Sequence, residues 1–291
     1  MPQLAPIVLF TFNRISETRA TVNALRKNFL AKESDLFIFS DGPKFLDDKK
    51  VAGVHNFIDT ISGFKSVTII KSSVNKGLAS SIIEGVSEIL KTYDSVIVLE
   101  DDLISSPNFL DFMNQALEFY RNNPMVFSIS GYTMDLPGLK NNKKDYYLGY
   151  RASSWGWGTW ADRWTKVDWD SNEFKPLSWK EKRNFRKGGN DLPRMLNNQL
   201  KKKIDSWAIR WVYHQFKIGG LTVFPKSSKI LSVGFGDDAT HTKKTRRFDT
   251  VLDNGKRIHF EFDDELILNP KLLKDFRNKF SIWSRIKDRI W

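Results

Sequence analysis

The chain has no cysteine, no long apolar run and no low-complexity segment. Without cysteine it has neither disulfides nor thiolate metal sites, which agrees with a reducing compartment. No stretch reaches the ~18 apolar residues of a membrane-spanning helix. The first residues, MPQLAPIVLFTFNR, lack the basic start of a secretory signal, so we interpret them as a first strand. These absences predict a cytoplasmic protein.

The chain does have a core-forming composition and unevenly distributed charge. Its 291 residues are 41% hydrophobic, enough for about two domains or one large α/β unit. The net charge is +12: residues 178–203 hold nine basic and two acidic residues, and residues 271–291 hold seven and two. These segments account for the whole excess. They favour an anionic partner, although residues 178–203 equally suit a solvated lysine-rich face.

Strand and helix patterns alternate in the first half of the chain. Buried strands are predicted at 6–12, 35–43, 66–73 and 95–102, with helical patterns between them. Such alternation predicts a largely parallel, doubly wound sheet. Later in the chain, MVFSISGY predicts a strand and IDSWAIRWVYHQFKIGG a helix. No regular period fits YYLGYRASSWGWGTWADRW.

Polar residues follow each predicted strand. Ligands of open α/β sheets bind at the carboxyl ends of the strands. We expect four polar groups to converge there: Asn13–Arg14, Asp41–Gly42, Asn75–Gly77 and Glu100–Asp102.

The acidic triplet ends the strand VIVLEDD. If the strand continues through it, Glu100 and Asp102 face one way and Asp101 the other. Carboxylates this close repel one another and attract a cation, and oxygen ligands favour Mg²⁺ or Mn²⁺. A solvated acidic turn is the alternative. Among the four histidines, His241 in VGFGDDATHT is the best candidate second ligand, although alone it also suits an ordinary loop.

The order of these motifs resembles the GT-A glycosyltransferases. FTFNR, NKGLASSIIEGV, VIVLEDDLISSPNFL, SWGWGTWADRW and WAIRW…GG follow one another within residues 5–242. The nearest resemblance is to bacterial surface-polysaccharide glycosyltransferases. More distantly, the chain is similar to the Golgi N-acetylglucosaminyltransferase that acts on mannose.

The resemblance implies a GT-A fold, a Rossmann-like mixed sheet flanked by helices. Residues 1–125 would bind a nucleotide sugar, 126–265 would form the acceptor-binding half, and 266–291 would form a basic amphipathic helix. It implies a metal-dependent, inverting transfer from a nucleotide-diphosphate sugar, with UDP favoured. The acceptor would be a glycan or a polyprenyl-diphosphate-linked saccharide at the inner face of the cytoplasmic membrane.

The resemblance also assigns roles to single residues. Asp41 would face the nucleobase beside Phe12, Asn13 and Arg14, and Lys76 and Gly77 would line the nucleotide pocket. Glu100 and Asp101 would hold the ribose or donor sugar. Asp102 would bind the metal, Mn²⁺ or Mg²⁺, and His241 the metal or the diphosphate.

The general base is assigned to Asp205. The Golgi relative has adjacent aspartates before a tryptophan, whereas this chain has Ile204-Asp205-Ser206-Trp207, with one acid missing. A helix N-cap is an equal alternative for Asp205. Arg210 would contact the diphosphate or brace Asp205.

Aromatic residues suggest two further contacts. Trp155 and Trp157 suit a sugar pocket, because indole faces match sugar rings, whereas Trp160 and Trp164 suit a core seam. In residues 271–291 one helix face combines Phe276, Phe280, Trp283 and Ile290. That face suits an anionic membrane or, equally, packing on the domain.

Two other functions compete with this interpretation. A nucleotidyltransferase that makes sugar nucleotides usually has a glycine-rich loop after its first strand, and FTFNRISE contains no glycine. A nucleic-acid binder would use the basic segment 178–203 but leave the acids unexplained. We therefore expect no nucleic-acid partner.

Overall fold

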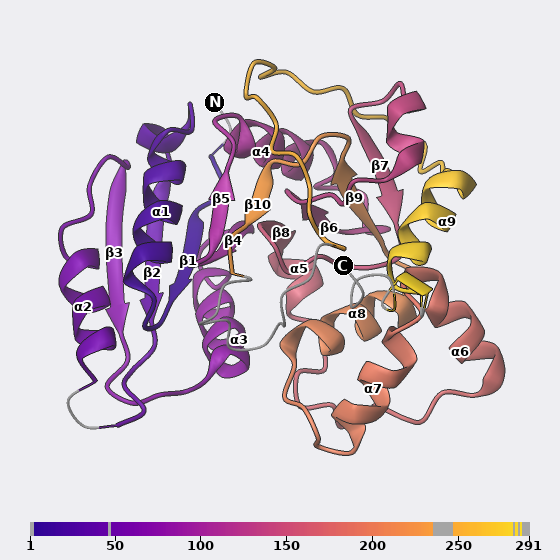
Figure 1. The fold of residues 1–291 in the computed structure, drawn as a ribbon, viewed down its shortest axis with the longest axis horizontal. Helices are drawn as coiled ribbons and strands as arrows, with labels where there is room; N and C mark the ends of the chain where they lie inside the picture. Colours follow the sequence, from indigo (N-terminus) through magenta and orange to yellow (C-terminus); the bar gives the residue numbers. More distant parts are fainter. Residues whose placement is uncertain (1–2, 46–47, 235–246, 282, 285, 287–291) are drawn as a thin grey trace.

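The computed structural model describes residues 3–45, 48–234, 247–281, 283–284 and 286, and these build one mixed sheet flanked by helices (Figure 1). Within them, eight strands follow the order β3-β2-β1-β4-β8-β6-β9-β7, and β10 pairs with β5 in a separate ribbon. The strands are β1 (Ile7–Thr11), β2 (Asp35–Ser40), β3 (Ser66–Lys71), β4 (Ser95–Glu100), β5 (Leu103–Ser105), β6 (Val126–Ser130), β7 (Tyr146–Gly149), β8 (Trp157–Trp160), β9 (Leu221–Pro225) and β10 (Ile230–Ser232).

Helices connect most of these strands. They are α1 (Ile15–Arg26), α2 (Lys49–Ile58), α3 (Leu78–Ile89), α4 (Phe109–Phe119), α5 (Ala161–Trp164), α6 (Trp179–Phe185), α7 (Leu192–Leu200), α8 (Trp207–Lys217) and α9 (Pro270–Lys279), with 3-10 turns η1 (Ala31–Glu33), η2 (Pro137–Asn141) and η3 (Arg186–Gly188). None of the helices in the described ranges has the length and apolar character to cross a bilayer.

The first half of the sheet is parallel, as predicted. β1 lies between β2 and β4, and β3 pairs with β2, all in the same direction. β1 is buried on both faces because its side chains alternate between two cores. Ile7 and Leu9 belong to the core shared with α1, α2 and α4, and Val8 and Phe10 belong to the core shared with α3. The predicted α/β class is confirmed; the division at residue 125 stays a prediction.

The segment without a regular period contains short elements. β7, β8 and α5 all lie within YYLGYRASSWGWGTWADRW. β8 runs antiparallel to both β4 and β6 and so joins the two halves of the sheet. A side chain at Gly158 would come within 2.9 Å of the Val96 carbonyl, so glycine permits this close pairing. Four-residue strands are too short for their alternation to be recognised in sequence.

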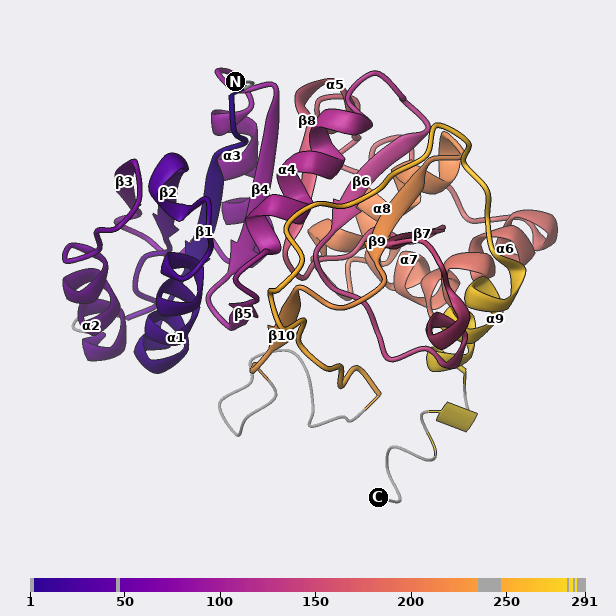
Figure 2. The same cartoon turned by 90° about the horizontal axis from the view of Figure 1, so that it is seen from above.

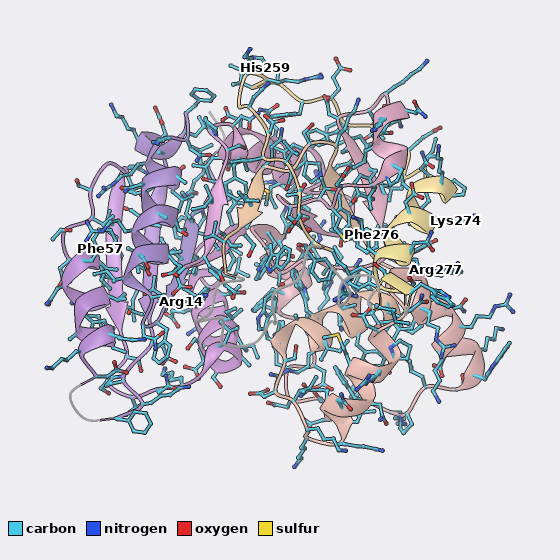
Figure 3. All side chains as sticks on the ribbon, in the orientation of Figure 1. Arg14, Phe57, His259, Lys274, Phe276 and Arg277 are labelled. Atoms are coloured by element: carbon cyan, nitrogen blue, oxygen red, sulfur yellow. The ribbon has the colours of Figure 1, made fainter. Side chains whose placement is uncertain are left out.

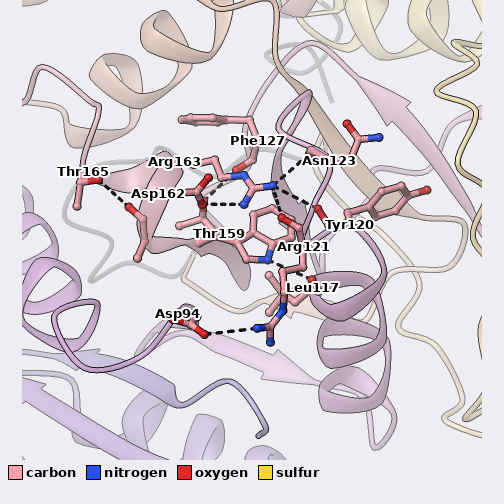
Figure 4. Close-up of polar contacts among 12 residues, drawn as sticks. Asp94, Leu117, Tyr120, Arg121, Asn123, Phe127, Thr159, Asp162, Arg163 and Thr165 are labelled. Carbon is pink, nitrogen blue, oxygen red and sulfur yellow. Dashed lines mark hydrogen bonds and ion pairs between the residues drawn. The ribbon is translucent and has the colours of Figure 1, made fainter. Parts of the chain in front are cut away.

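Arg163 of α5 binds the backbone at the end of α4 and so connects the second half of the chain to the first (Figure 4). Its buried guanidinium donates to the carbonyl oxygens of Tyr120, Arg121 and Asn123 at 3.3, 2.7 and 3.1 Å. It also lies 4.2 Å from the centre of the Trp160 ring. A cation at a helix C-terminus satisfies the unpaired carbonyls and opposes the helix dipole.

The C-terminal helix packs on the domain. Leu272, Phe276 and Phe280 are buried and belong to the core, so the apolar face expected to meet a membrane is turned inward from α9 to Phe280. Trp283 is 76% exposed. Ile290 lies outside the described residues.

Candidate active site

The four polar groups at the strand ends converge as expected. Because β1, β2, β3 and β4 are parallel, the residues after each strand lie at one edge of the sheet. Arg14, which follows β1, contacts the acids that follow β4. Asp41, which follows β2, contacts the loop that follows β3. This edge is therefore assembled from four separate parts of the chain.

The acidic triplet turns out of the strand after its first residue. β4 ends at Glu100, and Asp101 and Asp102 form a turn before β5. The condition for alternating faces is therefore not met: Arg14 pairs with Asp101 and also with Asp102, whose Oδ2 lies 3.0 Å away. A turn brings both carboxylates to the same side, where one guanidinium reaches them.

Burial and mutual repulsion disfavour negative charge in this cluster. Burial raises the pKa of Glu100 to about 8; Asp102 and Asp101 add to the increase and Arg14 opposes it. Burial also raises the pKa of Asp101 to about 6, again against the effect of Arg14. Of the described cations, Arg14 is the one that acts on these carboxyl groups. An additional cation would stabilise their ionised forms.

Thr21 of α1 stabilises the acidic turn through two hydrogen bonds to its backbone. Its buried hydroxyl donates to the Asp101 carbonyl at 2.8 Å and accepts from the Leu103 amide at 3.1 Å. Our sequence analysis missed this residue. A polar residue on the buried side of an otherwise amphipathic helix was the available signal.

The β5–β10 ribbon brings a second chain segment to Asp102. The Val233 amide donates to the Asp102 carbonyl at 2.9 Å. A side chain at Gly234 would have to displace the Asp102 carboxylate, so glycine permits this close approach. His241, the second ligand predicted from sequence, lies outside the described residues. Among those described, no three His, Asp or Glu side chains form a metal-binding group.

The carboxylate of Asp41 is fully engaged in hydrogen bonds from nearby residues. One carboxylate oxygen accepts from the amides of Gly42 and Lys76, and the other from the Gly77 amide and the Asn75 side chain, all at 2.8–3.0 Å. A carboxylate accepts about four hydrogen bonds. Asp41 therefore clamps the Asn75–Gly77 loop in this structure and has no oxygen left for a nucleobase. The Lys76 side chain forms an ion pair with Glu84, whose Oε2 lies 2.6 Å from the Lys76 Nζ.

A cavity of about 560 Å³ opens beside the acidic turn, between the β1–α1 turn and the start of α2. Phe12, Asn13 and Arg14 line it, as do Lys44 and Phe45 from the loop after β2. Arg14 belongs to both places: it lines the cavity and binds Asp101 and Asp102. Arg14 therefore connects the cavity to the acidic turn.

Asp205 and Arg210 form a pair at the start of α8. Arg210 lies 2.6 Å from the Asp205 carboxylate, and it also donates to the Trp169 carbonyl at 2.7 Å. The N-cap of α8 is Ser206, whose hydroxyl accepts from the Ile209 amide, so the capping alternative for Asp205 is wrong. The Asp205 side chain is 69% exposed. Arg210 thus braces Asp205, one of its two expected roles.

The two tryptophans predicted for a sugar pocket have different surroundings. Trp157 is fully buried, with its ring centre 4.2 Å from that of Trp211 and 5.2 Å from that of Trp207. No face of it is open to a sugar, so we assign Trp157 to the core. Trp155 is only partly buried and lies edge-on to Tyr132 and Phe248. Trp164 is buried in the core, as expected.

Comparisons with protein-family models and with curated proteins give no match. Among solved structures, the chain is similar to the mannosyltransferase PcManGT from Pyrobaculum calidifontis in complex with GDP-Man and Mn²⁺. The TM-score is 0.39 with 9% identity, over 54% of this chain and 45% of that one. It is also similar to S. aureus TarS 1-349, with a TM-score of 0.43 and 10% identity, over 79% of this chain and 60% of that one. The chain spans less than two thirds of either neighbour. With scores this low, the function is argued from the site.

Proposed function

We propose that this chain is a metal-dependent glycosyltransferase that uses a nucleotide-diphosphate sugar. The observation that carries the proposal is the position of Arg14, which joins the cavity at the ends of β1 and β2 to the acidic turn at the end of β4. A nucleoside in the cavity would direct its diphosphate toward Asp101 and Asp102. Two anions in contact require a cation between them, and within the described part of the chain the cation paired with these carboxylates is Arg14.

The residues present fit a divalent metal. Asp102 offers oxygen ligands in a half-buried turn, and Gly234 keeps larger side chains away from it. We propose Asp102 and His241 as ligands of Mn²⁺ or Mg²⁺. The bound ion would neutralise charge on the departing diphosphate.

The remaining donor roles follow from position. Phe12 and Asn13 line the cavity and are proposed to contact the nucleoside. Glu100 and Asp101 are proposed to face the ribose or the donor sugar. Lys76 and Gly77 are proposed to line the nucleotide pocket, with Asp41 holding their loop in place through its hydrogen bonds to both amides.

Asp205 is proposed as the general base. In an inverting transfer, the acceptor oxygen bonds to the anomeric carbon as the bond from that carbon to the diphosphate oxygen breaks. The base accepts the proton of the acceptor hydroxyl. The ion pair with Arg210 orients Asp205. Trp155 is proposed to contact the donor or acceptor sugar.

The donor and acceptor are further proposals. We propose a UDP-sugar donor and an acceptor that is a glycan or a polyprenyl-diphosphate-linked saccharide, used in surface-polysaccharide biosynthesis. The order of the sequence motifs supports this choice.

Replacing Asp102 tests the metal and donor site. We expect Asp102→Ala to abolish transfer and to remove the Mn²⁺-dependent rise in melting temperature that a nucleoside diphosphate or nucleotide sugar gives the wild type. Asp94→Ala is the matched control, because Asp94 precedes the same strand and its side chain is 84% exposed. Wild-type activity of Asp102→Ala in Mn²⁺-replete buffer would contradict the metal role. A wild type that responds to none of these nucleotides would contradict the proposed function.

Replacing Asp205 separates chemistry from binding. We expect Asp205→Asn to lower kcat by about 10²–10⁴-fold, the usual contribution of a general base, with the donor Kd unchanged. Asp162→Asn is the control, since Asp162 is also exposed and also paired with an arginine, at 2.7 Å. An unchanged kcat would leave Asp205 only the role of neutralising Arg210.

A further inference from the structure

The fold brings the two basic segments of the chain together. α9 packs against η3, which lies between α6 and α7, and α6 and α9 are neighbours in both views (Figures 1 and 2). Arg151 links them: its guanidinium holds Asp191 at 2.8 and 3.1 Å and stacks 4.2 Å from the centre of the Phe280 ring. Segments far apart in sequence therefore build one surface.

We define the basic face by the described cations of these segments. Nine come from residues 178–203 and four from α9: Lys180, Lys182, Arg183, Arg186, Lys187, Arg194, Lys201, Lys202, Lys203, Lys271, Lys274, Arg277 and Lys279. All are exposed except Lys279, which is half-buried. Figure 3 shows Lys274 and Arg277 on α9, well away from Arg14 of the candidate active site.

The positive charge of the basic face is not compensated. Within the described residues, none of these cations forms an ion pair. Lysines elsewhere are partly paired: Lys71 pairs with Asp59 and Lys91 with Glu88, each at 2.6 Å, whereas Lys27 and Lys32 form no ion pair with the described residues.

The acids within the basic face are already engaged. Glu181 accepts from the Ser178 amide and hydroxyl, Asp191 from Arg151, and Asp275 from the Gly138 amide at 2.9 Å. These carboxylates hold local structure, so the cations face solvent with no opposing charge. Their charge is therefore available to an anionic partner in place of solvent counterions.

Two tryptophans accompany these cations. Trp179, at the start of α6, is 73% exposed, and Trp283, just after α9, is 76% exposed. Within the described part of the chain, the guanidinium of Arg183 lies over the Trp179 ring, 5.8 Å from the ring centre. Exposed tryptophan among lysine and arginine is typical of proteins that lie on a membrane, since the indole ring prefers the headgroup region.

We propose that the basic face docks the protein on an anionic phospholipid bilayer. Each basic residue close to such a surface contributes about 1 kcal/mol of attraction, and the cations extend over three helices and a turn, which suits a broad plane. The buried apolar side of α9 excludes insertion of that helix, so the contact is peripheral. This surface lies outside the proposed catalytic site and does not depend on its function.

Vesicle sedimentation tests the proposal. We expect the protein to bind vesicles of phosphatidylcholine mixed with phosphatidylglycerol, to bind phosphatidylcholine alone far more weakly, and to be released at about 1 M salt, where charges are screened beyond about 3 Å. The triple variant Lys182→Glu/Lys187→Glu/Lys274→Glu should bind at least about 100-fold less, since each of the three lost cations contributes ~1 kcal/mol and the three added carboxylates are repelled by the surface. Trp179→Ala should bind several-fold less with the charge unchanged.

A matched variant controls for net charge. Lys27→Glu/Lys32→Glu/Lys256→Glu makes the same charge change at exposed lysines outside the basic face and should keep most of the binding. Equal losses in the two triple variants, both folded by circular dichroism, would overturn the proposal. Equal binding to both vesicle types, or displacement from vesicles by a small molar excess of duplex DNA, would also overturn it. No nucleotide sugar is used, so the result is independent of transferase activity.

Discussion

Thr21 is a buried hydroxyl that couples α1 to the acidic turn. It bonds both the carbonyl of Asp101 and the amide of Leu103, the groups on either side of Asp102. Asp102 thus depends for its position on a residue that does not itself face the cavity. We regard Thr21 as a positioning residue.

Thr21→Val keeps the shape of the side chain and removes its hydrogen bonds. Leaving two buried backbone groups unpaired should lower the free energy of unfolding by about 1–3 kcal/mol. It should also weaken Mn²⁺ binding in a titration with nucleoside diphosphate, because the turn is no longer fixed. Thr21→Ser should restore Mn²⁺ affinity. Wild-type Mn²⁺ affinity in a destabilised Thr21→Val would show that the hydroxyl serves stability alone.

Asp41 shows where sequence reasoning about single residues stops. Its place after β2, at the ligand edge, was predicted correctly. Its partners were not, because they are backbone amides of a loop more than thirty residues later in the chain. Trp157 is a similar case: its sequence neighbours do not show that Trp207 and Trp211 cover its ring.

At the scale of elements, the segment from Phe248 to Leu268 acts as a strap across α4. Phe260 and Phe262 pack against Phe112 of that helix. Lys229, which is buried, lies 2.9 Å from Asp253 in the strap and 4.7 Å from the centre of the Phe260 ring. An ion pair and an aromatic contact therefore hold the strap at one point.

Asp253→Asn should remove the ion pair between Lys229 and the strap. Burial alone would raise the pKa of Asp253, but hydrogen bonds from Lys229 and Gly255 lower it below its usual value of 3.8. A lowered folded-state pKa stabilises the fold above about pH 4, and this contribution is lost as the pH falls through the folded-state pKa. The variant leaves Lys229 unpaired, so it should lose about 3 kcal/mol at pH 7.

Urea unfolding of wild type and variant between pH 7 and pH 3 measures this effect. The difference between them should shrink as the pH falls below 4. Asp263→Asn is the control in the same strap, because Asp263 is half exposed and its pair with Lys144 should contribute much less. A constant difference across the pH range would show that the ion pair does not stabilise the strap.

The elements were predicted unevenly, for a physical reason. The four parallel strands are continuous apolar runs, because a sheet covered on both faces needs them, and each was found to within three residues of its bounds. β7 and β8 were missed, since each is only four residues long; glycine ends β7 and interrupts β8. The strap has no periodicity, so only the structure reveals it.

At the scale of the whole molecule, charge is divided between two ends. Carboxylates gather at the strand ends around Arg14, and unpaired cations gather on α6, η3, α7 and α9. The sequence predicted both groups, because each is a local run of like residues. It did not predict that the two basic segments meet, since that contact depends on the packing of α9 against η3.

The pairing of β5 with β10 sets the order in which the candidate site is completed. Leu103 pairs with Ser232 and Ser105 with Ile230, so the two strands are made far apart in time. At about 5–20 residues per second, a ribosome needs roughly 6–25 seconds to travel between them. During that interval β1 to β4 are present, but the acidic turn lacks its second support. The nascent chain therefore carries an exposed edge at β5, and a chaperone that shields such edges would act within this interval.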